Sequence, residues 1–229
     1  MYYLSFDVAN KSLATSFVYY DNNYKCLFKE SYLNDNTNIN NNINNIYNNL
    51  KETNNKLNNI IEYLYFNVED LIPGKKVKDT DIIERSKSLK KYMSDLKLII
   101  NKTISEKNVT RIYVLIEYQL SSNYNANAIY NQIIYEFSQH DSDLYEIIIM
   151  NPSYKNKIYF NNDLKHSVFI QKYTNNYLAN KNHTKSNFLY FLKTFKLEYV
   201  LNNIKAKNID DLADSFMQIF AFIKYIKKE

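Results

Sequence analysis

The chain has 229 residues and contains a single glycine, Gly74. Phosphate-binding loops need several glycines, because their backbone adopts left-handed conformations and approaches the phosphate closely. One glycine therefore excludes the G-x-G-x-x-G dinucleotide fingerprint and the P-loop, and no nucleotide cofactor is expected. Metal-held carboxylates remain as the main way in which such a chain could act on a phosphodiester.

Cysteine and histidine are also too sparse for the familiar metal and disulfide frameworks. Cys26 is the single cysteine, and His140, His166 and His183 lie far apart without the spacing of metal ligands. The first residues, MYYLSFDVANK, lack the basic start and apolar core of a signal peptide. No apolar run approaches the ~20 residues of a membrane span. We therefore expect an intracellular protein without membrane association.

Positive charge is concentrated toward the end of the chain. The net charge is +5, and residues 151–229 contain 13 Lys against 6 acidic residues. A basic final third is typical of a protein that binds a phosphate backbone. It is equally compatible with a solvated lysine-rich surface, because the excess of Asn, Lys, Ile and Tyr has the pattern of an AT-rich gene. Charge alone therefore leaves the partner open.

Hydrophobic periodicity predicts a single α/β domain. Strands are expected at 2–8, 14–21, 24–33, 111–120 and 144–150, with a hairpin turn at Asp21-Asn22-Asn23. The segment IPGKK (72–76) predicts a further turn. Helices are expected from Thr80 or Asp81 to about Lys107, over 126–139, from Pro152, in short pieces between 163 and 201, and over 209–227. The predicted fold is a mixed sheet of about five strands with an N-terminal antiparallel hairpin, flanked by helices.

An Asn-rich insertion is expected at about 34–70. Asn accounts for 14 of the 26 residues between 34 and 59. Apolar residues recur there at helical spacing, but Asn is a poor helix former. The segment is therefore either an amphipathic helix or a tolerated surface insertion. The apolar residues in question are Ile39, Ile43, Ile46, Leu50, Leu57, Ile60 and Ile61.

Four carboxylates interrupt elements that are otherwise apolar. Asp7 lies within YLSFDVA, Glu117 ends IYVLIE, and Asp211 and Asp214 lie on an apolar helix. Burial of an unpaired carboxylate costs several kcal/mol, so basic partners, a raised pKa or metal ions must compensate. Taken singly, each acid also fits a turn, a cap or the start of a helix. Asp211 and Asp214, however, share one helix face.

Hard oxygen ligands from several elements suit Mg²⁺ or Mn²⁺. Two such ions roughly 4 Å apart can clamp a phosphodiester, one activating water and the other stabilising the leaving oxygen. Such a site needs neither a glycine-rich loop nor a cysteine. A metal site held by carboxylates is therefore not excluded by the composition.

The segments FDVANKSLA, VLIEYQ and DDLADSF, in this order, resemble the Holliday junction resolvases of the ribonuclease H-like superfamily. The poxvirus type is closest, and the bacterial RuvC and fungal mitochondrial enzymes are more distant. The resemblance implies a ribonuclease H-like fold and a homodimeric endonuclease that cuts branched DNA, the four-way junction, in recombination, repair and replication. It implies that Asp7, Glu117, Asp211 and Asp214 hold two Mg²⁺ ions, for which Mn²⁺ substitutes. If the gene is viral, the host cytoplasm is the expected location.

Two lysine-containing segments extend the resemblance. NPSYKNK resembles a family segment with a lysine shortly after a proline, which implies a catalytic, DNA-binding Lys155 near the scissile phosphate, or its neighbour Lys157 in the same role. KNHTK matches a basic stretch ahead of the last helix, which implies that Lys181 and Lys185 contact DNA phosphates. The chain departs from the family at Ala9, where a glycine is usual.

Two other functions remain open at this stage. A related nuclease that acts on hybrids, flaps or forks would use the same four carboxylates. A non-catalytic nucleic-acid-binding relative would be expected to have lost at least one of them. Several tyrosines are candidates either for stacking on unpaired bases or for core packing, namely Tyr118, Tyr124, Tyr130 and Tyr154.

Overall fold

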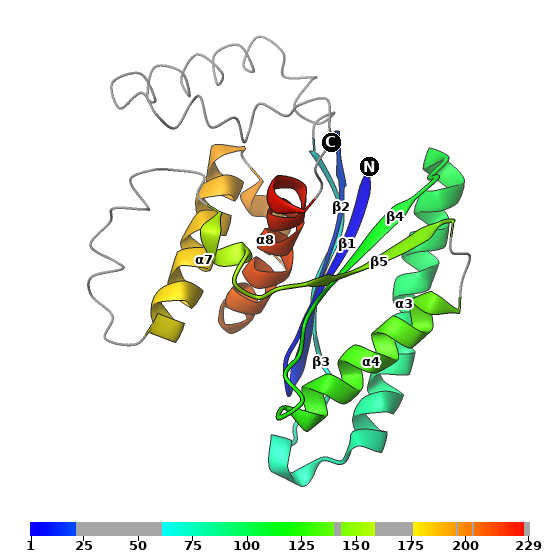
Figure 1. The fold of residues 1–229 in the computed structure, drawn as a ribbon, viewed down its shortest axis with the longest axis vertical. Helices are drawn as coiled ribbons and strands as arrows, with labels where there is room; N and C mark the ends of the chain where they lie inside the picture. The colour runs from blue at the N-terminus through cyan, green and yellow to red at the C-terminus, as the bar shows by residue number, and fades with distance from the viewer. Residues whose placement is uncertain (22–60, 140–142, 159–175, 196, 203, 227–229) are drawn as a thin grey trace.

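A mixed sheet of five strands forms the centre of the described chain (Figure 1). The computed structural model describes residues 1–21, 61–139, 143–158, 176–195, 197–202 and 204–226. Across the sheet the strands are β3 (Ile61–Asp70), β2 (Ser12–Tyr20), β1 (Tyr2–Val8), β4 (Ile112–Glu117) and β5 (Tyr145–Met150). β2 runs antiparallel to both of its neighbours, β3 and β1, whereas β1, β4 and β5 run parallel to one another. This topology confirms the predicted fold class, a mixed sheet of about five strands flanked by helices, and its N-terminal antiparallel pair is β1 and β2. The hairpin predicted at Asp21-Asn22-Asn23 falls largely on residues outside the described ranges.

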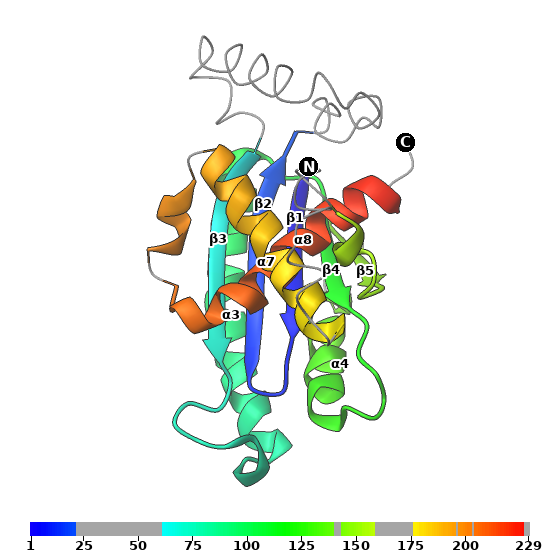
Figure 2. The same ribbon diagram turned by 90° about the vertical axis from the view of Figure 1, so that its left-hand side faces the viewer.

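Helices cover both faces of the sheet. The helices α3 (Ile82–Lys107) and α4 (Tyr124–Ser138) cover one face, and α7 (Asn176–Thr194) and α8 (Ile209–Tyr225) cover the other (Figures 1 and 2). Short 3-10 helices complete the described elements, namely η3 (Val77–Asp79), η4 (Lys155–Lys157), η5 (Glu198–Leu201) and η6 (Ala206–Asn208). No helix in the described ranges has the length and apolar character that crossing a membrane requires.

Cover on both faces explains why β1 is apolar on both sides apart from Ser5 and Asp7. Side chains alternate between the two faces, so Leu4, Phe6 and Val8 pack in the core beneath α3 and α4. Tyr3 packs in the core beneath α7 and α8. The same alternation places Asp7 on the α8 side of the sheet.

The central strand β4 follows the same rule. Ile112, Val114 and Ile116 pack toward α3 and α4, whereas Tyr113 and Leu115 pack toward α8. Glu117, the last residue of β4, therefore faces α8 as well. Two acids on neighbouring strands thus share one face of the sheet.

Local signals in the sequence set the ends of α3. The Asp81 side chain accepts a hydrogen bond from the backbone N–H of Glu84 at 2.8 Å, which caps the first turn. Asn108 ends the helix in the left-handed conformation with φ of 50°. Gly74 has φ of 73° in the turn closed by the Lys75 N–H to Ile72 carbonyl bond. The helix and the turn at 72–76 are therefore confirmed.

The strand β3 was not predicted. Its sequence IEYLYFNVED is rich in aromatic and β-branched residues, which favour a pleated strand, and it pairs antiparallel with β2. The predicted insertion extended to residue 70, beyond the part of the segment that is rich in Asn, and Ile61 was assigned to a possible helix within it. The insertion therefore cannot extend beyond residue 60. The predicted strand at 24–33 and the rest of the Asn-rich segment lie outside the described residues.

Two smaller predictions also need correction. Residues 152–154 after β5 form a turn that leads into η4, so Pro152 does not begin an α-helix. Between 163 and 201, α7 is a single helix of 19 residues rather than several short pieces. Residues 159–175 of that region lie outside the described ranges.

A buried arginine joins the β1–β2 turn to the segment that precedes α3. Arg85 is 1% exposed, and its guanidinium donates to the backbone carbonyls of Asn10, Val77 and Thr80. No carboxylate forms an ion pair with it within the described ranges. The planar guanidinium thus satisfies carbonyls from both segments at once.

Replacement of this arginine should be costly. Arg85→Met should lower the free energy of unfolding by about 2–3 kcal/mol, because it leaves buried carbonyls without donors. Urea titration followed by far-UV circular dichroism measures the loss. Arg111→Met is the matched control, since Arg111 is largely exposed and pairs with Glu146 at 3.2 Å. That change should cost less than about 1 kcal/mol, and equal losses would contradict a special role for Arg85.

Candidate active site

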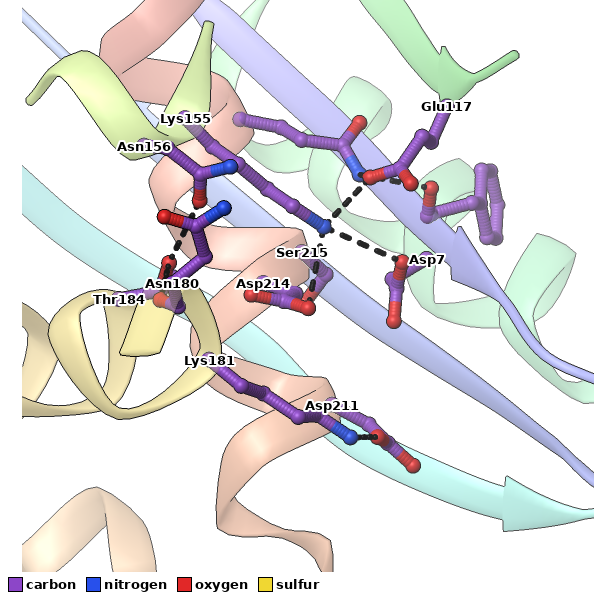
Figure 3. Close-up of polar contacts among 12 residues, drawn as sticks. Asp7, Glu117, Lys155, Asn156, Asn180, Lys181, Thr184, Asp211, Asp214 and Ser215 are labelled. Atoms are coloured by element: carbon purple, nitrogen blue, oxygen red, sulfur yellow. Dashed lines mark hydrogen bonds and ion pairs between the residues drawn. The ribbon is translucent and has the colours of Figure 1, made fainter. Parts of the chain in front are cut away.

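Four elements meet where the parallel strands β1 and β4 end, and each contributes charged side chains (Figure 3). Phe6 lies opposite Ile116 in the parallel register. The next residues, Asp7 and Glu117, are therefore neighbours on the face that α8 covers. The carboxyl ends of parallel strands are common positions for functional sites in α/β sheets.

Helix α8 supplies further acids, and its position is fixed by its neighbours. Asp211 and Asp214 are three residues apart, so both lie on the helix side that faces the strand ends (Figure 3). The Ser215 and Ser16 hydroxyls form a buried hydrogen bond of 2.7 Å, which ties α8 to β2. Phe216 and Phe220 are fully buried. These contacts hold α8 in one register against the sheet.

The side chain of Lys155 extends from η4 into the middle of the acids. Its Nζ lies 2.5 Å from Glu117 Oε2, 3.0 Å from Asp214 Oδ2 and 3.7 Å from Asp7 Oδ1. All four side chains are between 9% and 13% exposed. We call Asp7, Glu117 and Asp214 the carboxylate cluster. Of the four predicted acids, these three thus surround the Lys155 ammonium, and Asp211 lies at the edge of the group.

Burial and crowding raise the pKa of every member of the carboxylate cluster. Burial, reinforced by Asp214 and Asp211 against the opposing ammonium of Lys155, raises the pKa of Asp7 to about 7. Burial also raises the pKa of Glu117 and of Asp214, although Lys155 opposes both shifts. Burial alone would lower the pKa of Lys155, but the three carboxylates outweigh it and raise that pKa. One ammonium therefore leaves the cluster short of positive charge.

Asp211 lies at the edge of the carboxylate cluster. Its Oδ2 accepts a hydrogen bond of 2.9 Å from the Ser12 hydroxyl, and its Oδ1 lies 3.2 Å from Lys181 Nζ. Lys185 Nζ lies 2.7 Å from Asp210 Oδ1. Both lysines expected to contact DNA thus lie beside the start of α8, where they pair with acids.

The remaining lysines and tyrosines of the sequence analysis occupy different environments. Lys155 is 7% exposed and lies within the cluster rather than on the surface. Lys157 is exposed, with its ammonium 5.2 Å from the centre of the Tyr154 ring. Tyr118 and Tyr124 are exposed beside the end of β4. Tyr130 is buried in the core, and Tyr154 stacks on Tyr225 with ring centres 5.8 Å apart.

Sequence reasoning missed Gln218, one helical turn beyond Asp214. This side chain is 2% exposed, and its Nε2 lies 3.3 Å from the Phe6 carbonyl and 3.4 Å from Glu117 Oε2. The nitrogen must face these two acceptors, because the amide oxygen would be repelled by both. The oxygen Oε1 is buried and has no hydrogen-bond partner among the described residues. The available signal in the sequence was the spacing: Gln218 follows Asp214 by four residues, so both polar side chains lie on the same side of an apolar helix.

His183 is the one histidine among the described residues, and it lies beside η4 and within α7. His183 is buried, with Nε2 3.2 Å from the Ile158 carbonyl and hydrogen bonds to Asn187. Burial lowers the pKa of His183, although the Ile158 carbonyl opposes that shift. His140 and His166 lie outside the described residues.

The chemistry of the carboxylate cluster fits a divalent cation. Within the described ranges, no three His, Cys, Asp or Glu side chains are arranged to hold a metal ion as they stand. At the point where the cluster oxygens converge, the Lys155 ammonium takes up the space. Three buried carboxylates facing one ammonium nevertheless form a set of hard oxygen donors with excess negative charge. That is the donor set expected for Mg²⁺ or Mn²⁺.

Comparison with known proteins gives structural neighbours but no close relative in sequence. No family model matches the chain, and no curated protein matches it. Two of the structural neighbours are structures of the fowlpox virus Holliday junction resolvase. The resolvase in complex with its Holliday junction DNA is 18% identical, covers 100% of both chains and gives a TM-score of 0.44. A second structure of the fowlpox virus resolvase is 17% identical, covers 99% of this chain and 100% of its own, and gives a TM-score of 0.41.

The identities and TM-scores of these neighbours are low, so the similarity by itself decides neither the activity nor the site residues. The chemistry available to the site follows from its own geometry, in which Asp7, Glu117 and Asp214 converge on Lys155.

The raised pKa of Asp7 predicts how the stability of the metal-free protein depends on pH. Because the folded pKa of about 7 lies above the ordinary value of 3.8, the folded protein binds more protons than the unfolded chain between these values. The contribution of Asp7 to stability is therefore present at pH 4 and is lost as the pH rises through 7. Asp7→Asn should become progressively more stable than wild type over this range, as measured by urea unfolding without metal. A constant difference between the two proteins would contradict the raised pKa.

Proposed function

We propose that this protein is a Mg²⁺-dependent, structure-selective DNA endonuclease that resolves four-way junctions by paired, symmetric phosphodiester hydrolysis. The observation that carries the proposal is the carboxylate cluster, in which acids from β1, β4 and α8 converge within 3.7 Å of one nitrogen. In this proposal Asp7, Glu117, Asp214 and Asp211 hold two Mg²⁺ ions, and Mn²⁺ is an alternative.

The chain's own residues have distinct parts in this chemistry. When bound, the divalent ions would supply an activated water and stabilise the leaving oxygen. The packed strands and α8 hold the carboxylates in place, and the Gln218 amide contacts Glu117. Lys181 and Lys185 place two positive charges along the approach to the cluster, where a DNA phosphate is expected. Lys155 is the catalytic lysine of the proposal.

The choice of a four-way junction rests on the order of the three sequence motifs. The motif acids Asp7, Glu117, Asp211 and Asp214 all lie at the same end of the sheet (Figure 3). The fowlpox virus neighbours are junction resolvases, which agrees with the proposal although it does not depend on them. Two matched cuts require two sites related by symmetry, so we propose a homodimer. The proposed setting is recombination, repair and replication, in the host cytoplasm if the gene is viral.

A cleavage assay with defined substrates tests the proposal. End-labelled four-way junction, linear duplex, RNA–DNA hybrid, flap and fork of matched length are each incubated with the protein and Mg²⁺. Junction cleavage into two nicked duplexes, with cuts at symmetric positions and no cutting without a divalent ion, is the expected result. Analytical ultracentrifugation at the assay concentration should show a dimer.

Each alternative predicts a different outcome of this assay. Cutting of hybrids, flaps or forks with the junction left intact would identify a different ribonuclease H-like nuclease. Binding of the junction without cleavage under Mg²⁺ and Mn²⁺ would identify a non-catalytic nucleic-acid-binding protein. Junction cleavage that survives removal of the divalent ion would overturn the metal roles of the carboxylate cluster.

A further inference from the structure

Lys155 occupies the point that a cation needs in the proposed site. Its Nζ contacts one oxygen from each member of the carboxylate cluster, at 2.5, 3.0 and 3.7 Å. These contacts join η4 to β1, β4 and α8 at once. The side chain is nearly buried, so the three contacts form in a region of limited solvent.

The ammonium also explains why the acids converge without a metal. Three carboxylates held at one point repel one another, and this repulsion is strong where water is limited. A positive charge between them offsets the repulsion and keeps their oxygens directed inward. Lys155 therefore organises the cluster in the geometry that a cation needs.

We propose that Lys155 is the built-in counter-ion of the carboxylate cluster, and that a divalent cation binds by exchanging with its ammonium. This inference rests on the proposed function for the metal itself and adds a role for Lys155 as a positioning residue. The ammonium and a divalent ion need the same oxygens, and their like charges exclude both from one point. The four-carbon stem of lysine is flexible, so the ammonium can withdraw.

The exchange couples metal binding at the carboxylate cluster to the position of the Lys155 ammonium. Without metal, the ammonium neutralises part of the negative charge of the cluster and thereby reduces the repulsion that would destabilise the fold. With metal, Lys155 is released beside the site, where its charge is free for a substrate phosphate. Lys155 thus stabilises the metal-free cluster and, once displaced by metal, is placed to contact the substrate phosphate.

Metal binding to variants tests the exchange, because the expected change is opposite to that of structural damage. Isothermal titration of metal-free protein with Mn²⁺ should give a dissociation constant at least roughly tenfold lower for Lys155→Met than for wild type, since a repelling charge is removed. Lys155→Arg keeps the charge and should show no tightening. Lys157→Met removes a charge from the same 3-10 helix but from an exposed position, and should stay within about twofold of wild type.

A second measurement uses wild-type protein and does not depend on the folding of a variant. Lysines are acetylated with a pulse of acetic anhydride, with and without saturating Mn²⁺, and the labelled peptides are quantified by mass spectrometry. Acetylation of Lys155 should increase several-fold with Mn²⁺, whereas acetylation of Lys157 should not change. A Lys155 that stays protected in the Mn²⁺-bound protein would overturn the exchange.

The two proposals fail in different ways. If wild type binds Mn²⁺ and cleaves junctions but folded Lys155→Met binds Mn²⁺ no more tightly, the exchange is overturned and the proposed function stands. If neither protein binds Mn²⁺, the metal site of the proposed function fails, and the exchange fails with it.

Discussion

Asp214→Asn should reduce the rate of four-way junction cleavage by about a thousandfold or more. Asp214 is the α8 member of the carboxylate cluster, and its Oδ2 lies 3.0 Å from Lys155 Nζ. Loss of one metal-holding carboxylate removes several kcal/mol of transition-state stabilisation, and each 1.36 kcal/mol is tenfold in rate. Single-turnover cleavage of a labelled junction with Mg²⁺ measures the effect.

Two controls separate this loss from unfolding and from poor binding. The asparagine has nearly the same shape, and Glu117 still pairs with Lys155 at 2.5 Å, so the thermal midpoint should not fall. Junction affinity in Ca²⁺, measured by gel shift, should change little. Asp210→Asn is the matched variant, because Asp210 pairs with Lys185 outside the carboxylate cluster. Equal cleavage by Asp214→Asn and wild type would remove Asp214 from the proposed site.

The largest effect on stability is expected for Phe216→Ala. Phe216 is fully buried on α8, and its ring centre lies between 5.0 and 6.0 Å from the rings of Phe188, Phe220, Phe191, Phe66 and Tyr63. Truncation leaves a cavity among aromatic rings that belong to three elements, β3, α7 and α8. The free energy of unfolding should fall by about 3–5 kcal/mol.

Urea unfolding of wild type and variant, at one pH and without metal, measures this loss. Tyr135→Ala is the control, because that ring is 63% exposed on α4. Its effect should stay within about 0.5 kcal/mol. A comparable loss in both variants would show that the aromatic cluster does not hold α8 against the sheet. Phe216→Ala should also lower cleavage at temperatures near its midpoint, because α8 carries Asp211 and Asp214.

Much of the fold was predictable because local signals agree with the tertiary structure. The cap at Asp81, the turn at Gly74 and the apolar runs of β1, β4 and β5 each gave correct elements. β3 was missed for a physical reason. Its residues directly follow an Asn-rich segment, and the composition of that segment hid the aromatic and β-branched pattern that favours a strand.

The acids of the site were predictable because a charge inside an apolar element is conspicuous. Asp7, Glu117 and Asp214 were selected on that ground, and they lie together in the structure. The position of Lys155 was not predictable in the same way, because lysine is abundant and η4 gives no periodic pattern. Gln218 was also missed, since an amide next to Asp214 is recognised only once Phe6 and Glu117 are beside it.

The attachment of α8 to the first strands has a consequence for synthesis on the ribosome. Gln218 contacts Phe6 across 212 residues of chain, and Ser215 contacts Ser16 across 199. Domains fold as the chain emerges, but contacts of such separation must wait for their second partner. A nascent chain that lacks α8 therefore holds Asp7 and Glu117 without Asp214. Whatever chemistry the carboxylate cluster performs can therefore begin only after α8 has been synthesised and has packed against the first strands.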